Sequence, residues 1–363
     1  MQNWEATLSQ VHLNYDIQNS CQVVEVKKRG MKTIVLAIAT TVVMTSLVIA
    51  IISGAIPFPT GTANKSYQKS MAEASSNLTM TQNIVSNPNA RIAFIEPTFT
   101  HAAYANSFYV FYNKHINEPN GKAVTTDLPF LTAQIDPIAE QSSSHRFLSL
   151  VNNVKTLLPN SKIQVLTDEG ADAGAIFNKP IKNDDSNHTI NAFDILILGH
   201  QEYVTQKEYN NFKQFVQNGG KIIFLDGNVF FAEVKYDRVN STITLVKGHW
   251  WEFDGKAARA SVGERWKNET SQWVGSNYLC YSCSITFANN PFSYRHHEEQ
   301  YISNPKDVIL LNYRASDPNH TIATYELTYG KGKSVVVGLY SDDIIRNEKF
   351  VRFFDRLLLR QLP

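Results

Sequence analysis

The sequence of 363 residues contains little cysteine, almost no excess charge and no internal repeat. Three cysteines are too few for a fold that disulfides hold together. A formal net charge of +1 gives no reason to expect a nucleic-acid partner or a strongly charged substrate. The composition, with 43% hydrophobic and 18% charged residues, is that of an ordinary folded protein. The length allows one large domain or two small ones.

Long uncharged stretches are also scarce, and one of them stands out near the start of the chain. Residues 33–56 carry no charge and are rich in Ile, Val, Leu and Ala, and about 20 such residues suffice to cross a bilayer. Four basic residues precede this stretch: Lys27, Lys28, Arg29 and Lys32. The positive-inside rule then predicts a cytoplasmic tail at residues 1–32, a single transmembrane signal anchor at 33–56 and an extracytoplasmic remainder.

Two alternatives remain for this stretch, and both keep the following domain outside the cytoplasm. Ser53-Gly54-Ala55 is an acceptable signal-peptidase site, and Met31 could be the true start of a shorter signal peptide. All the N-x-S/T acceptor motifs follow the apolar stretch, which is consistent with export. They are Asn64, Asn77, Asn187, Asn240, Asn268 and Asn319. Residues 57–90, rich in Ser, Thr and Asn, are predicted to form a stalk.

The folded domain, predicted at residues 91–363, is organised around residues 193–228. Ile195 to Leu198 form an apolar run of the kind found in strands buried on both faces. Thr205 is a predicted N-cap, with Glu208 completing a capping box, and apolar residues then recur at helical spacing. Gly219 and Gly220 end that helix, and a second apolar run follows. The pattern predicts a strand–helix–strand unit with parallel strands.

Polar residues follow both of these predicted strands. His200, Glu202 and Tyr203 come after the first strand, and Asp226 and Asn228 come after the second. Ligands of open α/β sheets bind beyond the carboxyl ends of the strands. We therefore expect a binding or catalytic site at this edge, for which a small molecule is the expected ligand. Structural roles stay open, because His200 and Glu202 could cap the helix and Asp-Gly-Asn is typical of a turn.

Further strands and helices are predicted on both sides of this unit. Strands are expected at 92–95, 163–166, 308–313, 322–327 and 334–339, and helices after Thr100, after Ser144 and over 350–359. Residues 117–143 are polar and predict a loop, whereas residues 229–301 predict a β-rich insertion over the sheet edge. The predicted fold class is thus α/β, a mostly parallel sheet with flanking helices.

The order of these elements resembles the class I glutamine-amidotransferase-like fold. The H-x-E-Y motif of His200, Glu202 and Tyr203, the helix after it, Gly219-Gly220 and residues 225–228 resemble the C-terminal domain of the N,N-dimethylformamidase large subunit. The insertion is similar to that of membrane-anchored archaeal proteins of unknown function. The nucleophilic cysteine of the amidotransferases is missing after Leu225, so we do not expect glutamine amidotransferase activity.

The resemblance implies a metal site, because the formamidase family carries a single iron ion held by tyrosine and glutamate oxygens. Tyr203 matches the motif tyrosine of the family, and Glu264 is the residue that we assign as the glutamate ligand. His200 or Glu202 would act as the general base, with Asp226 orienting the histidine. Phenolate and carboxylate oxygens also suit a hard ferric ion on chemical grounds.

Two features of the insertion have mainly structural interpretations. Cys280 and Cys283 form a single CxxC, which predicts a disulfide in an exported domain, with free thiols or a redox pair as alternatives. Trp250, Trp251, Trp266 and Trp273 predict a small aromatic core, and a pocket for an apolar or sugar-like ligand is the alternative.

The sequence thus leaves two functional hypotheses. The first is an exported, membrane-tethered hydrolase that cleaves small amides or related C–N bonds with the help of a metal ion. The second is a cell-surface binding or structural domain that has kept the fold and lost the chemistry, because one fold hosts many functions.

Overall fold

The computed structural model describes residues 89–105, 107–118, 123–125, 128–135, 148–178, 190–261, 263–278, 299–301, 308–312, 322–337 and 347–363. All of them belong to one unit of the chain, Ser76–Pro363. The predicted anchor, the predicted stalk apart from its last two residues, and the pair Cys280 and Cys283 lie outside the described residues. Within the part of the chain that is described, no helix is long and apolar enough to span a membrane.

A seven-stranded sheet forms the centre of the described domain, in the order β16-β17-β18-β9-β7-β1-β4. Its strands are β1 (Arg91–Glu96), β4 (Lys162–Thr167), β7 (Ile195–Leu198), β9 (Lys221–Phe224), β16 (Val308–Asn312), β17 (Ile322–Tyr329) and β18 (Gly332–Val336). The neighbours from β18 to β4 are parallel, and β16 and β17 are added antiparallel at one edge. This sheet confirms the predicted α/β class.

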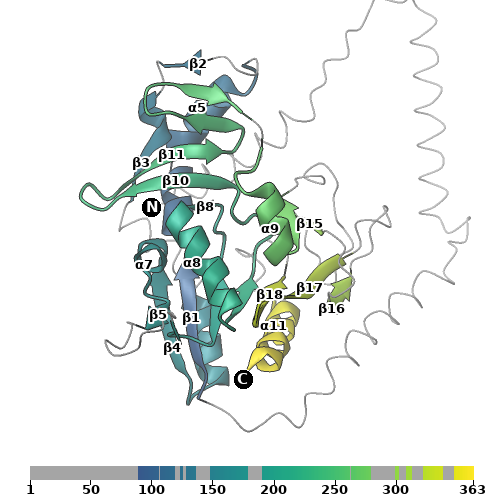
Figure 1. The fold of residues 1–363 in the computed structure, drawn as a ribbon. Coiled ribbons are helices and arrows are strands. Elements are labelled where there is room, and N and C mark those ends of the chain that lie inside the picture. Colours follow the sequence, from purple (N-terminus) through teal and green to yellow (C-terminus); the bar gives the residue numbers. More distant parts are fainter. Residues whose placement is uncertain are drawn as a thin grey trace, which may run out of the picture. The chain divides into compact units, whose positions relative to one another are not determined.

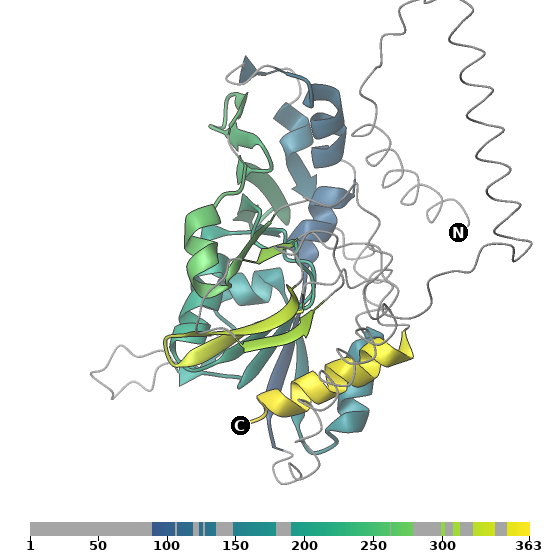
Figure 2. The same cartoon turned by 90° about the vertical axis from the view of Figure 1, so that its right-hand side faces the viewer.

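The central strand–helix–strand unit is present as predicted. Helix α8 (Gln206–Gln217) joins the parallel strands β7 and β9, and its cap Thr205 accepts a hydrogen bond from the Glu208 backbone N–H at 3.0 Å. All four residues of β7 are buried, because helices cover the sheet on both faces. Helix α8 packs on one face, while α11 (Glu348–Gln361) and a helix at 148–157 cover the other (Figure 2).

A second sheet lies beyond one end of the first sheet's strands (Figure 1). Its strands are β2 (Ala123–Val124), β3 (Thr132–Gln134), β8 (Tyr203–Val204), β10 (Ala232–Asp237), β11 (Thr242–Gly248), β12 (Trp251–Phe253) and β13 (Ala258–Ala260). Apart from the parallel pair of β8 with β10, its strand pairs are antiparallel. The fold is therefore α/β with mixed sheets.

This second sheet corrects the prediction of a plain loop at residues 117–143. Strands β2 and β3 and the 3₁₀ helix η2 (Leu128–Leu131) lie in that segment, and the two strands pair with β13 and β11. Such short strands lack an alternating pattern long enough to be recognised, and only their distant partners define them. The predicted insertion therefore shares its sheet with residues that precede the central unit.

The helical segment after β1 is also divided differently from the prediction. It forms α4 (Thr98–Tyr104) and α5 (Ser107–His115) instead of one helix capped by Thr100. Thr100 lies inside α4, where its hydroxyl accepts a hydrogen bond from the Tyr203 backbone N–H at 3.1 Å. These two helices pack with the second sheet in a core of their own, distinct from the core under α8.

Several smaller elements complete the described domain. They are α7 (Asp168–Ala173), α9 (Lys267–Trp273), and the strands β5 (Phe177–Asn178), β6 (Ile190–Asn191), β14 (Ser276–Tyr278) and β15 (Glu299–Tyr301). The predicted aromatic core of the insertion is confirmed in part. Trp251, Trp266 and Trp273 are buried, whereas Trp250 is 58% exposed.

Candidate functional site

The candidate site begins at the turn that follows β7. His200, Gln201 and Glu202 leave the first sheet here and lead into β8 of the second sheet. The backbone N–H of Phe230 donates to the Gln201 carbonyl at 2.8 Å, and that of Phe231 donates to the Glu202 carbonyl at 2.9 Å. The turn is therefore held by the start of the chain segment that forms β10, which fixes the direction of its side chains.

The Glu202 carboxylate is the centre of a buried polar cluster. It is 1% exposed, and Oε2 accepts a hydrogen bond of 2.6 Å from the Tyr104 hydroxyl at the end of α4. His200 Nε2 lies 3.3 Å from Oε2, and His249 Nε2 lies 3.4 Å from Oε1. Three segments that are far apart in the sequence thus meet at one carboxylate.

The electrostatics of the cluster keep Glu202 ionised. Burial alone would raise its pKa, but the hydrogen bond from His200, the nearby His249 and the Tyr104 hydroxyl together hold the pKa below the ordinary range. Burial lowers the pKa of His249, and the Glu202 charge opposes that shift only in part. At neutral pH the site therefore combines a carboxylate with a neutral imidazole.

His200 also connects Glu202 with the end of β9. Its Nδ1 lies 3.6 Å from Oδ2 of Asp226, so a carboxylate faces each of its ring nitrogens. The other Asp226 oxygen accepts from the Asn228 backbone N–H at 2.9 Å and closes the predicted turn. The side-chain oxygen of Asn228 is buried and accepts no hydrogen bond within the described part of the chain, so it remains available to a ligand.

Tyrosines from α4 and α5 form the wall on the other side of the cluster. The Tyr104 and Tyr109 rings lie 4.3 Å apart, and the Tyr109 hydroxyl lies 3.5 Å from His249 Nε2. Tyr112 stacks flat on His249, with ring centroids 4.1 Å apart. Burial is the main cause that raises the pKa of Tyr109 and of Tyr112, so both phenols are neutral without a bound cation.

His249 reaches the site through an unusual turn after β11. Gly248, His249 and Trp250 all have positive φ, at 114°, 49° and 72°. A Cβ at position 248 would lie 2.5 Å from the Phe231 carbonyl oxygen, so only glycine fits there. Positive φ at two non-glycine residues costs free energy that surrounding structure must offset, and such strain is concentrated at functional sites.

The structure brings together the three residues that the sequence predicted as catalytic, His200, Glu202 and Asp226. Tyr203 follows at once, but its fully buried hydroxyl lies 3.5 Å from that of Tyr112. Glu264 lies in the loop before α9 and is half-buried. The metal roles of Tyr203 and Glu264 stay predictions, as does the disulfide of Cys280 and Cys283, which are not described.

Sequence reasoning missed Tyr104, Tyr109 and His249 as site residues. The available signals were the five tyrosines and phenylalanines that lie within residues 104–112 and the His-Trp-Trp run at 249–251. Neither pattern has a spacing that points to a site. Only the tertiary fold shows that the two segments meet at Glu202.

Residues 56–314 match the family described as N,N-dimethylformamidase beta subunit-like, C-terminal. The chain belongs to this family. The match covers the whole cluster around Glu202, including the helices and the strand turn that supply its tyrosines and His249. The relation of this formamidase-like domain to the glutamine-amidotransferase fold stays a prediction.

Solved structures resemble this formamidase-like domain only weakly. The GH42 beta-galactosidase Gan42B from G. stearothermophilus is 15% identical, with a TM-score of 0.36, and the match covers 75% of this chain and 30% of the other. A beta-galactosidase from the haloarchaeon Halorubrum lacusprofundi is 12% identical over 80% of this chain and 33% of that enzyme, with a TM-score of 0.36. These values say nothing about activity.

A smaller protein is similar to this chain over its full length, with an equally low TM-score. The cytoplasmic protein STM1381 from Salmonella typhimurium LT2 is 9% identical, and the match covers 75% of this chain and 100% of that protein, with a TM-score of 0.36. The chain spans about a third of the length of the galactosidases above. No curated protein matches the formamidase-like chain.

The donor types in the cluster are compatible with the iron that the resemblance to the formamidase family implies. The described residues contain no group of three or more His, Cys, Asp or Glu side chains arranged to hold a metal ion. Tyrosine oxygens add further candidate ligands. The rings of Tyr104 and Tyr109 lie beside each other, and the Tyr104 hydroxyl donates a hydrogen bond to the Glu202 carboxylate. Two phenol oxygens and one carboxylate are hard donors that a ferric ion prefers.

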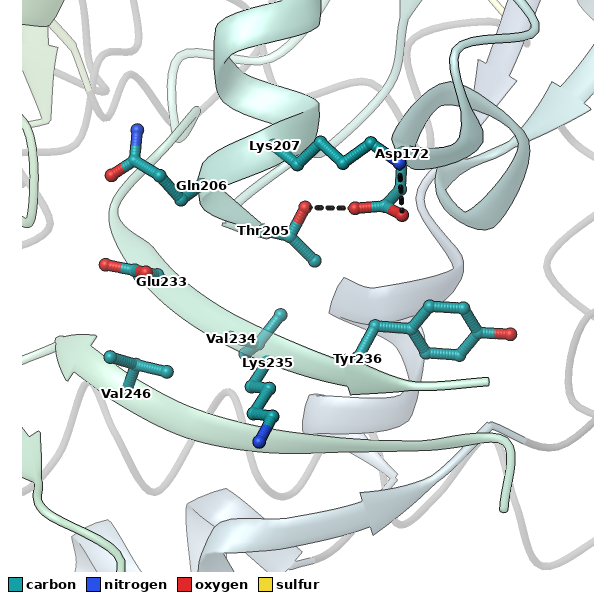
Figure 3. A pocket seen from close by; sticks show the side chains of 9 residues that line it. All are labelled: Asp172, Thr205, Gln206, Lys207, Glu233, Val234, Lys235, Tyr236 and Val246. Carbon is teal, nitrogen blue, oxygen red and sulfur yellow. Dashed lines mark hydrogen bonds and ion pairs between the residues drawn. The ribbon is translucent and has the colours of Figure 1, made fainter. Parts of the chain in front are cut away.

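A separate groove of about 300 Å³ opens at the N-terminus of α8 (Figure 3). It lies between that helix end and the strands β10 and β11. Nine residues line it: Asp172, Thr205, Gln206, Lys207, Glu233, Val234, Lys235, Tyr236 and Val246. None of the predicted site residues is among them, so this groove is distinct from the cluster around Glu202.

Proposed function

We propose that this domain is a metal-dependent hydrolase of small amides or related C–N bonds. The observation that carries the proposal is the buried, ionised Glu202 with a tyrosine hydroxyl at 2.6 Å and two imidazoles within 3.4 Å. Membership of the formamidase-like family supports it. A buried anion surrounded by hydrogen-bond donors and phenols favours a hard cation or a polar substrate at this point.

Tyr104, Tyr109 and Glu202 would hold the metal ion. A bound ferric ion would supply a Lewis acid that polarises the amide carbonyl. Binding requires both phenols to lose their protons, and the buried site raises the pKa of Tyr109 until such a cation compensates the charge. Tyr203, which the sequence predicted as a ligand, lies one residue from Glu202 and remains the alternative phenol.

His200 would act as the general base. Asp226 at Nδ1 orients the imidazole, and Nε2 faces the site beside Glu202. The free side-chain oxygen of Asn228 would accept a hydrogen bond from the N–H of a substrate amide. His249, neutral at neutral pH, would hold Tyr109 in place through the contact of 3.5 Å.

Metal analysis of the purified full chain, without a histidine tag, tests the proposal. We expect about one iron per chain, with the colour of a tyrosinate-to-iron transition. Tyr104→Phe and Tyr109→Phe should each lose iron and colour, while Tyr203→Phe, the matched control on β8, keeps both. If Tyr203→Phe alone loses iron, Tyr203 is the ligand and the assignment from geometry is wrong.

Two further results would count against the proposal. A chain that binds no metal even after reconstitution, yet folds, would favour the binding or structural domain instead. If the chain binds iron but cleaves none of a panel of formamides, acetamides and ureas, the metal site is supported and the hydrolase activity is refuted. In Glu264→Gln, loss of iron would show that the loop before α9 supplies the carboxylate ligand.

We also propose that the domain is exported and tethered by the N-terminal apolar stretch. The support is in the sequence alone: residues 33–56, the basic residues before them and the acceptor motifs after them. Protease added to intact cells should then digest the domain and spare an N-terminal tag. Protection of the domain would refute this topology.

A further inference from the structure

Two other acidic side chains meet in the interior beside the candidate site. Asp168 opens α7, Glu208 lies in the first turn of α8, and both are 0% exposed. Asp168 is well supplied with donors, because Oδ2 accepts from the Phe99 backbone N–H at 2.8 Å and Oδ1 from the Gln201 side-chain amide at 3.4 Å. It is therefore placed to carry the negative charge.

Glu208 is the opposite case. Neither of its carboxyl oxygens accepts a hydrogen bond of normal geometry within the described part of the chain. Its carboxyl group interacts most strongly with the carboxyl group of Asp168, and more weakly with Asp172 and the backbone of Thr205. Two carboxylates cannot bond to each other, but a carboxylic acid can donate to a carboxylate. The contact of Glu208 with Asp168 is thus favourable only if Glu208 keeps its proton.

The charges around the pair do not remove this need for a proton. Glu169 and Asp172 on α7 add negative charge, and Thr98 and Thr205 donate to them at 2.6 Å. Lys207 on α8 forms its ion pair with Asp172, at 3.7 Å, as Figure 3 shows. From the sheets, Glu96 ends β1, and Tyr236 on β10 faces Glu169 and Asp172.

We infer that Asp168 and Glu208 share one proton at neutral pH, with Glu208 as a neutral acid that donates to the Asp168 carboxylate. The pair positions the site through Gln201, whose side-chain amide donates to Asp168 and to the Ile95 carbonyl at 2.9 Å. Gln201 lies between His200 and Glu202, so the pair fixes the turn that carries them. The inference does not depend on the proposed amide chemistry.

The shared proton predicts that stability falls as the pH rises above the ordinary carboxyl range. Burial is the main cause that raises the pKa of both groups well above the ordinary carboxyl value. Asp168 raises the pKa of Glu208 further, whereas the hydrogen bond from Glu208 lowers that of Asp168, as expected when Glu208 holds the proton. The unfolded chain loses this proton above about pH 4.3, whereas the folded chain keeps it. The folded-to-unfolded ratio therefore falls about tenfold per pH unit from that point until the pair ionises.

Two measurements on the full chain test the inference, thermal unfolding as a function of pH and the infrared spectrum. Glu208→Gln keeps a donor toward Asp168 but cannot ionise, so its stability should lose this tenfold slope and exceed that of the wild type at pH 9. The infrared band of a buried, protonated carboxylic acid should be present in the wild type and absent in Glu208→Gln. Glu169→Gln, the matched control on α7, should keep both the slope and the band.

The opposite results would overturn the inference. If the band is missing in the wild type, or if Glu208→Gln has the wild-type slope, no proton is shared. If Ca²⁺ or Mg²⁺ alone raises the melting temperature of the wild type but not that of Glu208→Gln, the pair binds a cation instead. A chain without iron or amidase activity would still show the band, so failure of the proposed function is a distinct result.

Discussion

Glu202 and Glu208 lie close together in the sequence, and the fold buries both almost completely, yet the two carboxyl groups have opposite properties. The pKa of Glu202 is lowered and that of Glu208 is raised well above the ordinary value. Burial pushes both upward by the same mechanism, because it removes water from the charged form. The difference comes from the partners, which are two imidazoles and a phenol for Glu202 and a second carboxyl for Glu208.

The comparison shows how one short segment serves two purposes. Glu202 points to the second sheet, where α4, α5 and the turn after β11 meet it with donors. Glu208, after the Thr205 cap, packs against α7, where the local residues are acidic. The first centre, Glu202 with its donors, holds an anion that can attract a cation or a substrate. The second centre, the pair of Asp168 and Glu208, holds a proton and through Gln201 fixes the turn that carries Glu202.

The largest difference should appear when each carboxyl is replaced by an amide. Glu202→Gln removes the charge that Tyr104 and two histidines contact, and a hydrogen bond to a charged group contributes about 1.5–3 kcal/mol. We expect a loss of about 2–3 kcal/mol in the free energy of unfolding at pH 7 in chelator, measured with urea. Glu208→Gln should lose none and should instead raise the free energy of unfolding at pH 7, since one neutral donor replaces another and the amide has no proton for the unfolded chain to give up above about pH 4.3. Equal losses in both variants would mean that both glutamates are charged.

The predictable part of the fold was the part with local signals. The strand, the Thr205 cap and the glycine-terminated helix around residues 195–225 lie where the sequence predicted them, because burial on both faces and capping leave patterns within a few residues. His200, Glu202 and Asp226 could be predicted as a group, since two parallel neighbours end at one edge.

The rest of the site depends on contacts between distant residues. Tyr104 and His249 join Glu202 from α4 and from the turn after β11, and no pattern in either segment shows that the segments meet. Glu208 was predicted only as half of a capping box. Its position against Asp168 follows from how α7 packs on α8, which is decided by tertiary structure.

The stability of the cluster around Glu202 at acid pH depends on His249 as well, and the expected effect is smaller. Burial is the main cause that lowers the pKa of His249, so the unfolded chain binds its proton below about pH 6.5 before the folded chain does. Stability should therefore fall as pH drops below that value, by up to about 1.4 kcal/mol per pH unit. The contribution of Glu202, whose pKa is lowered, should persist until the pH falls below the ordinary glutamate range.

His249→Phe separates these two acid effects. Phenylalanine keeps an aromatic ring on Tyr112 but cannot titrate, so the slope between about pH 6.5 and 5 should decrease while the loss at lower pH remains. Urea unfolding of both chains at half-unit pH steps measures this difference. An unchanged slope would assign the titration to another group and would mean that His249 is charged in the folded protein.

The smallest effect is expected for Lys207, the cation whose ion pair with Asp172 lies beside the second centre in the described part of the chain. Lys207 lies 3.7 Å from Asp172 and its side chain is 62% exposed, and exposed ion pairs contribute about 0–1 kcal/mol. Lys207→Ala should therefore change the free energy of unfolding at pH 7 by less than about 0.5 kcal/mol. It should also leave the pH range of the stability loss from the shared proton unchanged, because solvent screens Lys207 from the buried pair. If that loss instead extends to higher pH in Lys207→Ala, the lysine charge lowers the pKa of Glu208 in the folded wild type, and the contrast between the partners of Glu202 and those of Glu208 no longer holds.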